Sequence, residues 1–191
     1  MKKLLSLLVV LTYFFITDSH IFAQKLNPNL FGGLKFRNIG PAMTSGRIAD
    51  IAIHPNNENI WYVAVGSGGV WKTKNSGTTW KPIFENQKVY STGCITIDPN
   101  NPSTIWLGTG ENVGGRHAGF GDGVYVSHND GKSWKNMGLE NSEHLSKIIV
   151  HPENSDIIWV ASQGPLWSKG GDRGIYKSIN GGKTWQRTLG D

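Results

Sequence analysis

The densest group of chemically versatile side chains in the sequence lies between Gly108 and Gly123. This glycine-rich stretch contains two acids, Glu111 and Asp122, which are the residue type that cleaves glycosidic bonds by general acid and base catalysis. Glu111 and Asp122 are therefore the candidate catalytic pair. The alternative is a solvated hairpin in which the same charges only keep the loop soluble.

A second glycine-rich stretch, residues 162–174, adds an aromatic ring, an amide and further charges. Carboxylates, amide donors and an aromatic platform together suit a carbohydrate ligand. The candidate ligand-binding residues are Glu111, Asn112, Arg116, His117, Trp167 and Arg173. Two carboxylates about 5–10 Å apart across an open groove, Glu111 with Asp122 or with Asp50, would indicate hydrolysis. Carboxylates that point apart would indicate binding.

Both stretches belong to a sequence unit that occurs three times, about 50 residues apart. One block of the unit ends in tryptophan and is found at Thr73–Trp80, Ser127–Trp134 and Ser178–Trp185. A second block precedes it each time, as in Ile53-His54-Pro55 followed by Ile60-Trp61. Two blocks in a fixed order, three times over, indicate an internal repeat.

Each unit contains four short runs rich in β-branched and aromatic residues, separated by Gly, Pro, Asn and Asp. In the first unit these runs are Ile48–Ile53, Ile60–Val65, Val70–Lys74 and Thr79–Phe84. Four strands in about 50 residues match the size of a propeller blade. We therefore predict an all-β fold, a partial β-propeller with three four-stranded antiparallel blades at about residues 45–86, 91–138 and 144–189.

The block that ends in tryptophan is expected to form the turn between the third and fourth strands. An asparagine there bonds to backbone groups, a glycine supplies the permissive backbone, and the tryptophan pins the hairpin by burying its ring. Each buried ring contributes about 1.5–3 kcal/mol. These structural residues are Asn75, Gly77 and Trp80; Asn129, Gly131 and Trp134; and Asn180, Gly182 and Trp185.

The pattern Ser/Thr-x-Asn-x-Gly-x-Ser/Thr-Trp resembles the Asp-box, or BNR, repeat, with asparagine in place of the acid in all three copies. That repeat occurs in sialidases, in xyloglucan-degrading glycoside hydrolases and in sortilin-type receptors. The resemblance implies a β-propeller with Asp-box hairpin turns and leaves enzyme and binding protein both open. The run Ser67–Thr73 most resembles the large exported bacterial proteins of the sortilin/xyloglucanase-like group.

Two departures from the family patterns weigh against catalysis by this chain. In the xyloglucan-degrading enzymes a catalytic acid stands two residues before a Gly-Gly pair of the first blade. The matching position, before Gly68-Gly69, is Gly66, which cannot transfer a proton. The sialidase signature is only loosely matched by residues 36–41, with the wrong spacing.

The N-terminus reads as a secretory signal. Two lysines follow Met1, an apolar run extends from Leu4 to Ile16, and Ile21-Phe22 and the small residue Ala23 precede Gln24. We expect cleavage near Ala23, a mature chain without a transmembrane segment, and export to the periplasm or the extracellular space. The apolar run is shorter than the ~20 residues that an uncleaved anchor would need. Residues 24–44 would form an N-terminal segment that could supply a closing strand.

Charge and motif content narrow the expected partners. The net charge of +5 comes from scattered residues rather than a basic, aromatic-interleaved stripe, so we expect no nucleic acid partner. The sequence has no Cys/His metal spacing and no dinucleotide motif, so we expect no metal and no cofactor. Cys94 is the only cysteine, which excludes an internal disulfide.

The leading hypothesis is a non-catalytic binding or scaffold module for a glycan or a protein partner. One alternative is the N-terminal fragment of a glycoside hydrolase, xyloglucanase-like or sialidase-like, and another is a receptor-like or peptidase-associated interaction propeller. Propellers close with four to eight blades. The missing blades are expected in a longer chain, or else in a homo-oligomer.

Overall fold

A computed structural model describes Asn27 and residues 46–112 and 118–190 of the chain. The expected signal peptide, nearly all of the segment 24–44, and the candidate residues Arg116 and His117 lie outside the described residues. The described part contains strands and one short 3-10 helix, η2 (Glu140–Ser142). None of its helical segments is long and apolar enough to cross a membrane.

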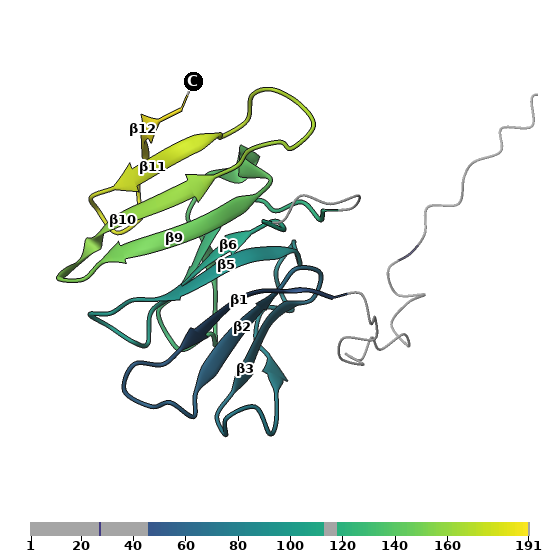
Figure 1. Ribbon diagram of the computed structural model, residues 1–191, viewed down its shortest axis with the longest axis vertical. Helices are drawn as coiled ribbons and strands as arrows, with labels where there is room; N and C mark the ends of the chain where they lie inside the picture. The colour runs from purple at the N-terminus through teal and green to yellow at the C-terminus, as the bar shows by residue number, and fades with distance from the viewer. Residues whose placement is uncertain (1–26, 28–45, 113–117, 191) are drawn as a thin grey trace, which may run out of the picture. The chain divides into compact units, whose positions relative to one another are not determined.

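Twelve strands form three four-stranded antiparallel sheets, which confirms the predicted all-β class (Figure 1). The first sheet contains β1 (Ile48–Ile53), β2 (Trp61–Val65), β3 (Gly69–Thr73) and β4 (Lys81–Pro82). The second contains β5 (Thr92–Ile97), β6 (Ile105–Thr109), β7 (Val124–Ser127) and β8 (Lys135–Asn136). The third contains β9 (Leu145–His151), β10 (Asn154–Ser162), β11 (Gly174–Ser178) and β12 (Gln186–Leu189). Strands pair in chain order within each sheet, as in a partial β-propeller.

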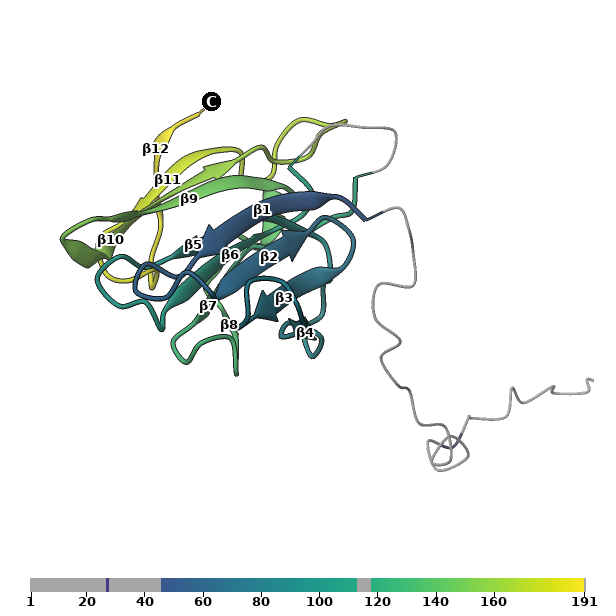
Figure 2. The same ribbon diagram turned by 60° about the horizontal axis from the view of Figure 1, so that its bottom comes forward.

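The sheets pack face to face, so that two apolar cores separate three layers (Figure 2). The second sheet contributes to both cores because successive side chains of a strand point to opposite faces. Ile105 and Leu107 of β6 face the first sheet, whereas Trp106 between them faces the third. β6 therefore contributes side chains to both interfaces between the sheets.

Each sheet has the same turn between its third and fourth strands. We call these the repeat turns: residues 73–80, 127–134 and 178–185. In the first, the Asn75 side chain accepts a hydrogen bond from Thr79 N at 2.9 Å and donates one to Thr79 Oγ1 at 3.0 Å. Gly77, at φ +87°, donates its N–H to Thr73 Oγ1 at 3.0 Å. Equivalent bonds recur around Asn129 and Asn180, so three separate turns share one polar framework.

The tryptophans of the second and third repeat turns connect neighbouring sheets. The indole N–H of Trp134 donates to the carbonyl of Ile83 at 2.7 Å, and that of Trp185 donates to the carbonyl of Met137 at 2.7 Å. Each ring therefore bonds to the sheet that precedes its own. The sequence of the hairpin alone did not predict this contact. Trp80 of the first turn instead lies against Trp61 of its own sheet, with ring centroids 6.4 Å apart. Trp80 is 40% exposed, so the expectation that each turn buries its tryptophan is wrong for this copy, whose ring has no preceding sheet to contact in the described part of the chain.

Cys94 lies at the interface between the second and third sheets and is fully buried. Burial, reinforced by the carboxylate of Asp50, raises the pKa of the Cys94 thiol to about 12. At pH 8 only about one thiol in 10⁴ is then ionised, and the thiolate is the reactive form. We expect iodoacetamide to leave Cys94 unmodified in the folded protein and to modify it completely in urea, as read by mass spectrometry. Equal modification rates in the two conditions would contradict this burial.

Candidate functional site

Strand connections alternate between two rims of the stacked sheets. The turn rim carries the repeat turns and the β1–β2, β5–β6 and β9–β10 connections. Hydrogen bonds from Ser76 N to Asn59 O, from Asp130 N to Ser103 O and from Gly181 N to Asp156 O join these connections in pairs. The opposite rim, which we call the loop rim, carries the β2–β3, β6–β7 and β10–β11 connections and the links between sheets. The four candidate ligand-binding residues that the structure describes, Glu111, Asn112, Trp167 and Arg173, belong to the loop-rim connections.

Glu111 leaves the end of β6 and is only 3% exposed. Its carboxylate pairs with the guanidinium of Arg47 and accepts a hydrogen bond from Ser67 Oγ at 2.6 Å. A Cβ atom at Gly66 would lie 3.0 Å from Glu111 Oε1, so the carboxylate fills the space that a side chain at Gly66 would need. Glu111, just after β6, is thereby fixed against the residue that precedes β1 and against the β2–β3 connection of the first sheet.

The backbone next to Glu111 reaches the third sheet. His144 Nδ1 donates to the Glu111 carbonyl at 2.8 Å, and Gln163 Nε2 donates to the Asn112 carbonyl at 3.0 Å. The Asn112 amide donates in turn to Gly93 O at 2.6 Å. Residues 110–112 consequently contact all three sheets, and we call them the three-sheet junction.

Asp122 engages neighbours of its own sheet. Its carboxylate accepts a hydrogen bond from Tyr125 OH at 2.8 Å, and its N–H donates to Thr109 Oγ1 at 2.9 Å. Burial, together with the Asp122 carboxylate, raises the pKa of Tyr125 to about 12, so the phenol stays a hydrogen-bond donor. Glu111 and Asp122 therefore bond to different partners, and each carboxylate already accepts a hydrogen bond within the protein.

Asp50, the third candidate acid, lies among the first strands of the three sheets. Its carboxylate accepts a hydrogen bond from Ile95 N at 3.1 Å and lies 3.7 Å from Lys147 Nζ. β1, β5 and β9 are linked by these contacts. Within residues 46–112 and 118–190 no cluster of three His, Cys, Asp or Glu side chains is arranged to hold a metal ion.

The β10–β11 connection presents one free aromatic ring. The guanidinium of Arg173 donates to the carbonyls of Pro165 and Ser168, the latter at 3.3 Å, and so closes its own loop. Trp167, inside that loop, is 64% exposed. The loop is thus held from within while its largest apolar side chain faces solvent.

Two exposed aromatic rings on the loop rim were missed by the sequence reasoning. Tyr90 is 64% exposed, and its carbonyl accepts a hydrogen bond from Gly69 N at 2.7 Å, beside the β2–β3 connection. Phe120 is 58% exposed and lies over His144 with ring centroids 5.6 Å apart. Aromatic residues in otherwise polar connections were the available signal, because a loop has no core in which to bury them.

The chain resembles known proteins both in sequence and in structure. The chain is 22% identical over 156 residues to a probable oligoxyloglucan-reducing end-specific xyloglucanase of Neosartorya fischeri, covering 73% of this chain and 17% of that protein. A solved ancestral GH74 enzyme superposes with a TM-score of 0.57 at 25% identity, over 75% of this chain and 18% of that enzyme. YCF48 from Cyanidioschyzon merolae has the same fold over 76% of this chain and 38% of its own, with a TM-score of 0.51 at 18% identity.

No protein-family model matches the sequence. The sheets, their order and these likenesses together define the chain as a propeller-like protein. It spans about a fifth of the length of the xyloglucanase and GH74 relatives, at 17% and 18%.

Proposed function

We propose that this chain is part of an exported β-propeller that binds a glycan on its loop rim without cleaving it. The observation that carries the proposal is that the Glu111 carboxylate is buried and bonded within the protein. A general acid must reach the glycosidic oxygen of its substrate. The Glu111 carboxylate is buried and held by Arg47 and Ser67, which suits a connector between sheets rather than a proton donor.

The exposed rings of Tyr90, Phe120 and Trp167 support binding on the same rim. A sugar ring has an apolar face of C–H groups, which packs on an aromatic ring while its hydroxyls stay hydrated. Tyrosine and tryptophan suit such contacts because each has a large apolar body and a polar edge. The likeness to a xyloglucanase makes a β-glucan such as xyloglucan the first ligand to test.

The finer assignments are proposals that rest on sequence. The repeat turns are proposed to be Asp boxes with asparagine at the acid position, in a propeller of the sortilin/xyloglucanase-like group. Export is proposed from the N-terminal signal pattern. The relatives' greater length supports further blades outside residues 46–190.

A second candidate function is a segment of a glycoside hydrolase. The identity to a xyloglucanase and the fold likeness to a GH74 enzyme favour it. In that case the acids would come from parts of the protein outside the described residues, and the loop rim would form part of the substrate cleft.

Substitution of the exposed rings tests the binding proposal. We expect Trp167→Ala and Tyr90→Ala each to weaken xyloglucan binding about tenfold, because each removes one ring contact worth about 1.4 kcal/mol. The measurement is affinity electrophoresis of the purified chain in gels with increasing xyloglucan. Ile179→Ala is the matched control, because Ile179 is 70% exposed but lies in a repeat turn on the other rim. Unchanged mobility of both ring variants, or of the native chain at every xyloglucan concentration, would refute binding on the loop rim.

A further inference from the structure

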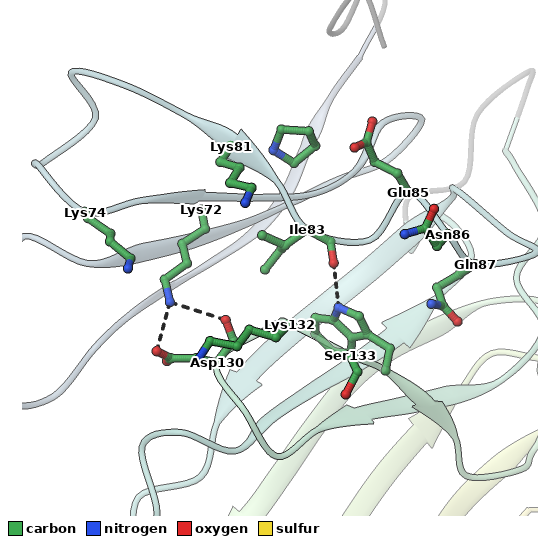
Figure 3. A pocket seen from close by; sticks show the side chains of 13 residues that line it. Lys72, Lys74, Lys81, Ile83, Glu85, Asn86, Gln87, Asp130, Lys132 and Ser133 are labelled. Carbon is green, nitrogen blue, oxygen red and sulfur yellow. Dashed lines mark hydrogen bonds and ion pairs between the residues drawn. The ribbon is translucent and has the colours of Figure 1, made fainter. Parts of the chain in front are cut away.

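A groove runs along the outer edge of the molecule between the first and second sheets (Figure 3). One wall consists of β3, the first repeat turn, β4 and the residues that follow β4, and the other is the repeat turn of the second sheet. Its volume is about 670 Å³. Tyr90, Phe120 and Trp167 do not line the groove, so its occupant is a separate question from the proposed glycan site.

The charged groups of the groove are mostly positive. Lysines line both walls, with Lys72, Lys74 and Lys81 on one side and Lys132 on the other. The acids of the lining are Asp130 and Glu85. Four ammonium groups against two carboxylates leave the groove with a formal charge of +2.

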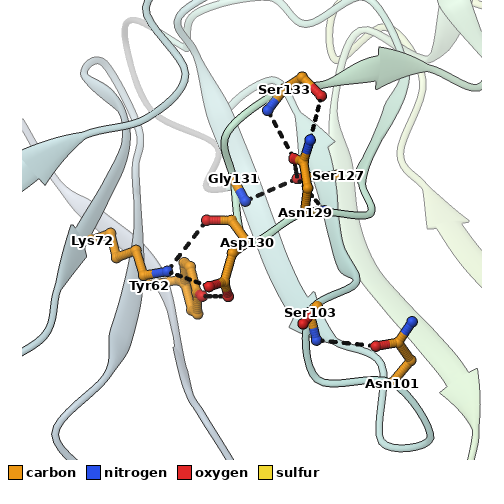
Figure 4. Close-up of polar contacts among 9 residues, drawn as sticks. All are labelled: Tyr62, Lys72, Asn101, Ser103, Ser127, Asn129, Asp130, Gly131 and Ser133. Atoms are coloured by element: carbon orange, nitrogen blue, oxygen red, sulfur yellow. Dashed lines mark hydrogen bonds and ion pairs between the residues drawn. The ribbon is translucent and has the colours of Figure 1, made fainter.

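One lysine is neutralised inside the protein. Lys72 is 7% exposed, and its ammonium lies 3.2 Å from Asp130 Oδ2 and 3.3 Å from the Asp130 carbonyl (Figure 4). Lys72 also lies over the ring of Tyr62, 4.8 Å from its centroid. These contacts hold Lys72 within the protein, so the other three lysines are the ones available to contact a ligand.

Lys74, Lys81 and Lys132 are exposed, and within the described part of the chain none of them pairs with a carboxylate. Two of them also act on Lys72. Burial lowers the pKa of Lys72, the carboxylate of Asp130 opposes this, and the positive charges of Lys74 and Lys132 lower the pKa. An anion in the groove would be attracted by the combined charge of these lysines.

The remaining polar lining is neutral and offers hydrogen bonds. Asn86 and Gln87 contribute amides and Ser133 a hydroxyl, whereas the indole N–H of Trp134 is already donated to the Ile83 carbonyl. No arginine lines the groove, so it lacks the planar fork that binds one carboxylate through two parallel bonds. Separate lysine charges with amide and hydroxyl donors between them suit a chain of hydroxyl-rich units carrying spaced anionic groups.

We propose that this groove binds a segment of an anionic polysaccharide, one that carries sulfate or carboxylate groups on its sugar units. The lysines contact the anionic groups, and the amides and Ser133 contact the hydroxyls. The groove is lined by residues of two sheets, so a ligand segment in it would contact both of them. Binding weakens as salt rises, because exposed charges are screened beyond about 10 Å at 0.1 M salt.

The test uses the purified chain with dextran sulfate, and with uncharged dextran of the same length as the comparison. We expect dextran sulfate to bind and dextran not to bind at this groove. Lys132→Gln should weaken binding about threefold, and the triple variant Lys74→Gln, Lys81→Gln, Lys132→Gln about 20-fold, since each exposed charge contact has a modest effect. Lys183→Gln is the matched control, because Lys183 follows Gly182 in the third repeat turn as Lys132 follows Gly131 in the second.

Circular dichroism and the thermal midpoint establish that each variant is folded. Equal losses for Lys132→Gln and Lys183→Gln would overturn the proposal, since they would show attraction to overall charge. Equal or tighter binding of polyglutamate or single-stranded DNA, lost in the triple variant, would also overturn it, because the groove would then recognise a peptide or a nucleic acid.

Discussion

Replacing Gly110 with alanine is expected to lower the free energy of unfolding by about 4 kcal/mol or more, a large part of the roughly 5–15 kcal/mol that stabilises an ordinary domain. Gly110 belongs to the three-sheet junction and has φ +81°, a conformation that side chains rarely adopt. An added Cβ would overlap the carbonyl oxygen of Glu143 and the Cα of His144, both backbone atoms that cannot move aside separately. The third sheet would have to separate from the second to make room.

Gly170→Ala is the matched control for this clash. Gly170 also has a positive φ, +93°, but a Cβ there would meet no atom within 4 Å. Backbone strain alone costs about 1–2 kcal/mol. Urea denaturation followed by tryptophan fluorescence gives both free energies, and similar losses for the two variants would show that close packing at the junction is not what stabilises the stacked sheets.

Asp130→Asn is expected to lower the free energy of unfolding by about 2 kcal/mol at pH 7. The Asp130 carboxylate accepts hydrogen bonds from Tyr62 OH at 2.7 Å and Lys72 Nζ at 3.2 Å (Figure 4). Asparagine has the same shape and tolerates the φ of +67° at this position. The loss would therefore reflect the missing negative charge beside a buried ammonium, reduced by the partial exposure of Asp130.

The same variant should change how stability depends on pH. Partial burial opposes ionisation of Asp130, but the bonds from Tyr62 and Lys72 outweigh it, and the pKa of Asp130 lies below its usual value. The stabilisation is therefore present above the unfolded pKa of about 4 and is lost as the pH falls through the folded pKa. The difference between native chain and variant should shrink below pH 4.

Asp156→Asn, at an exposed aspartate of β10, is the control for this titration. Its free energy of unfolding should follow that of the native chain from pH 7 to pH 3. A difference between the native chain and Asp130→Asn that stays constant over this range would show that the Asp130 charge does not connect the first two sheets.

Local patterns in the sequence were sufficient to predict the sheets. The run Ile48–Ile53 coincides with β1, because a short run rich in β-branched residues and bounded by turn residues is visible in any short window. The hydrogen bonds of Asn75 and Gly77 are also local, spanning at most four residues. Such features depend on residues close together in the chain, so they can be predicted from a single sequence.

The state of the candidate site could not be predicted in the same way. Glu111 pairs with Arg47, 64 residues earlier, and Asp130 bonds to Tyr62, 68 residues earlier. These contacts exist only because separate sheets stack, and no local spacing encodes them. Glu111 looked like a free acid in a glycine-rich loop, whereas the stacking of the first two sheets buries its carboxylate.

The most direct test of the account follows xyloglucan binding and cleavage in the same sample. Isothermal titration of the purified chain with a xyloglucan oligosaccharide gives the affinity, and analysis of the sample after incubation shows whether new reducing ends have formed. A glycan-binding propeller whose Glu111 connects sheets predicts saturable binding without new reducing ends. New reducing ends that accumulate in proportion to protein concentration, and disappear in Glu111→Gln while the chain stays folded, would contradict it and identify Glu111 as a catalytic acid.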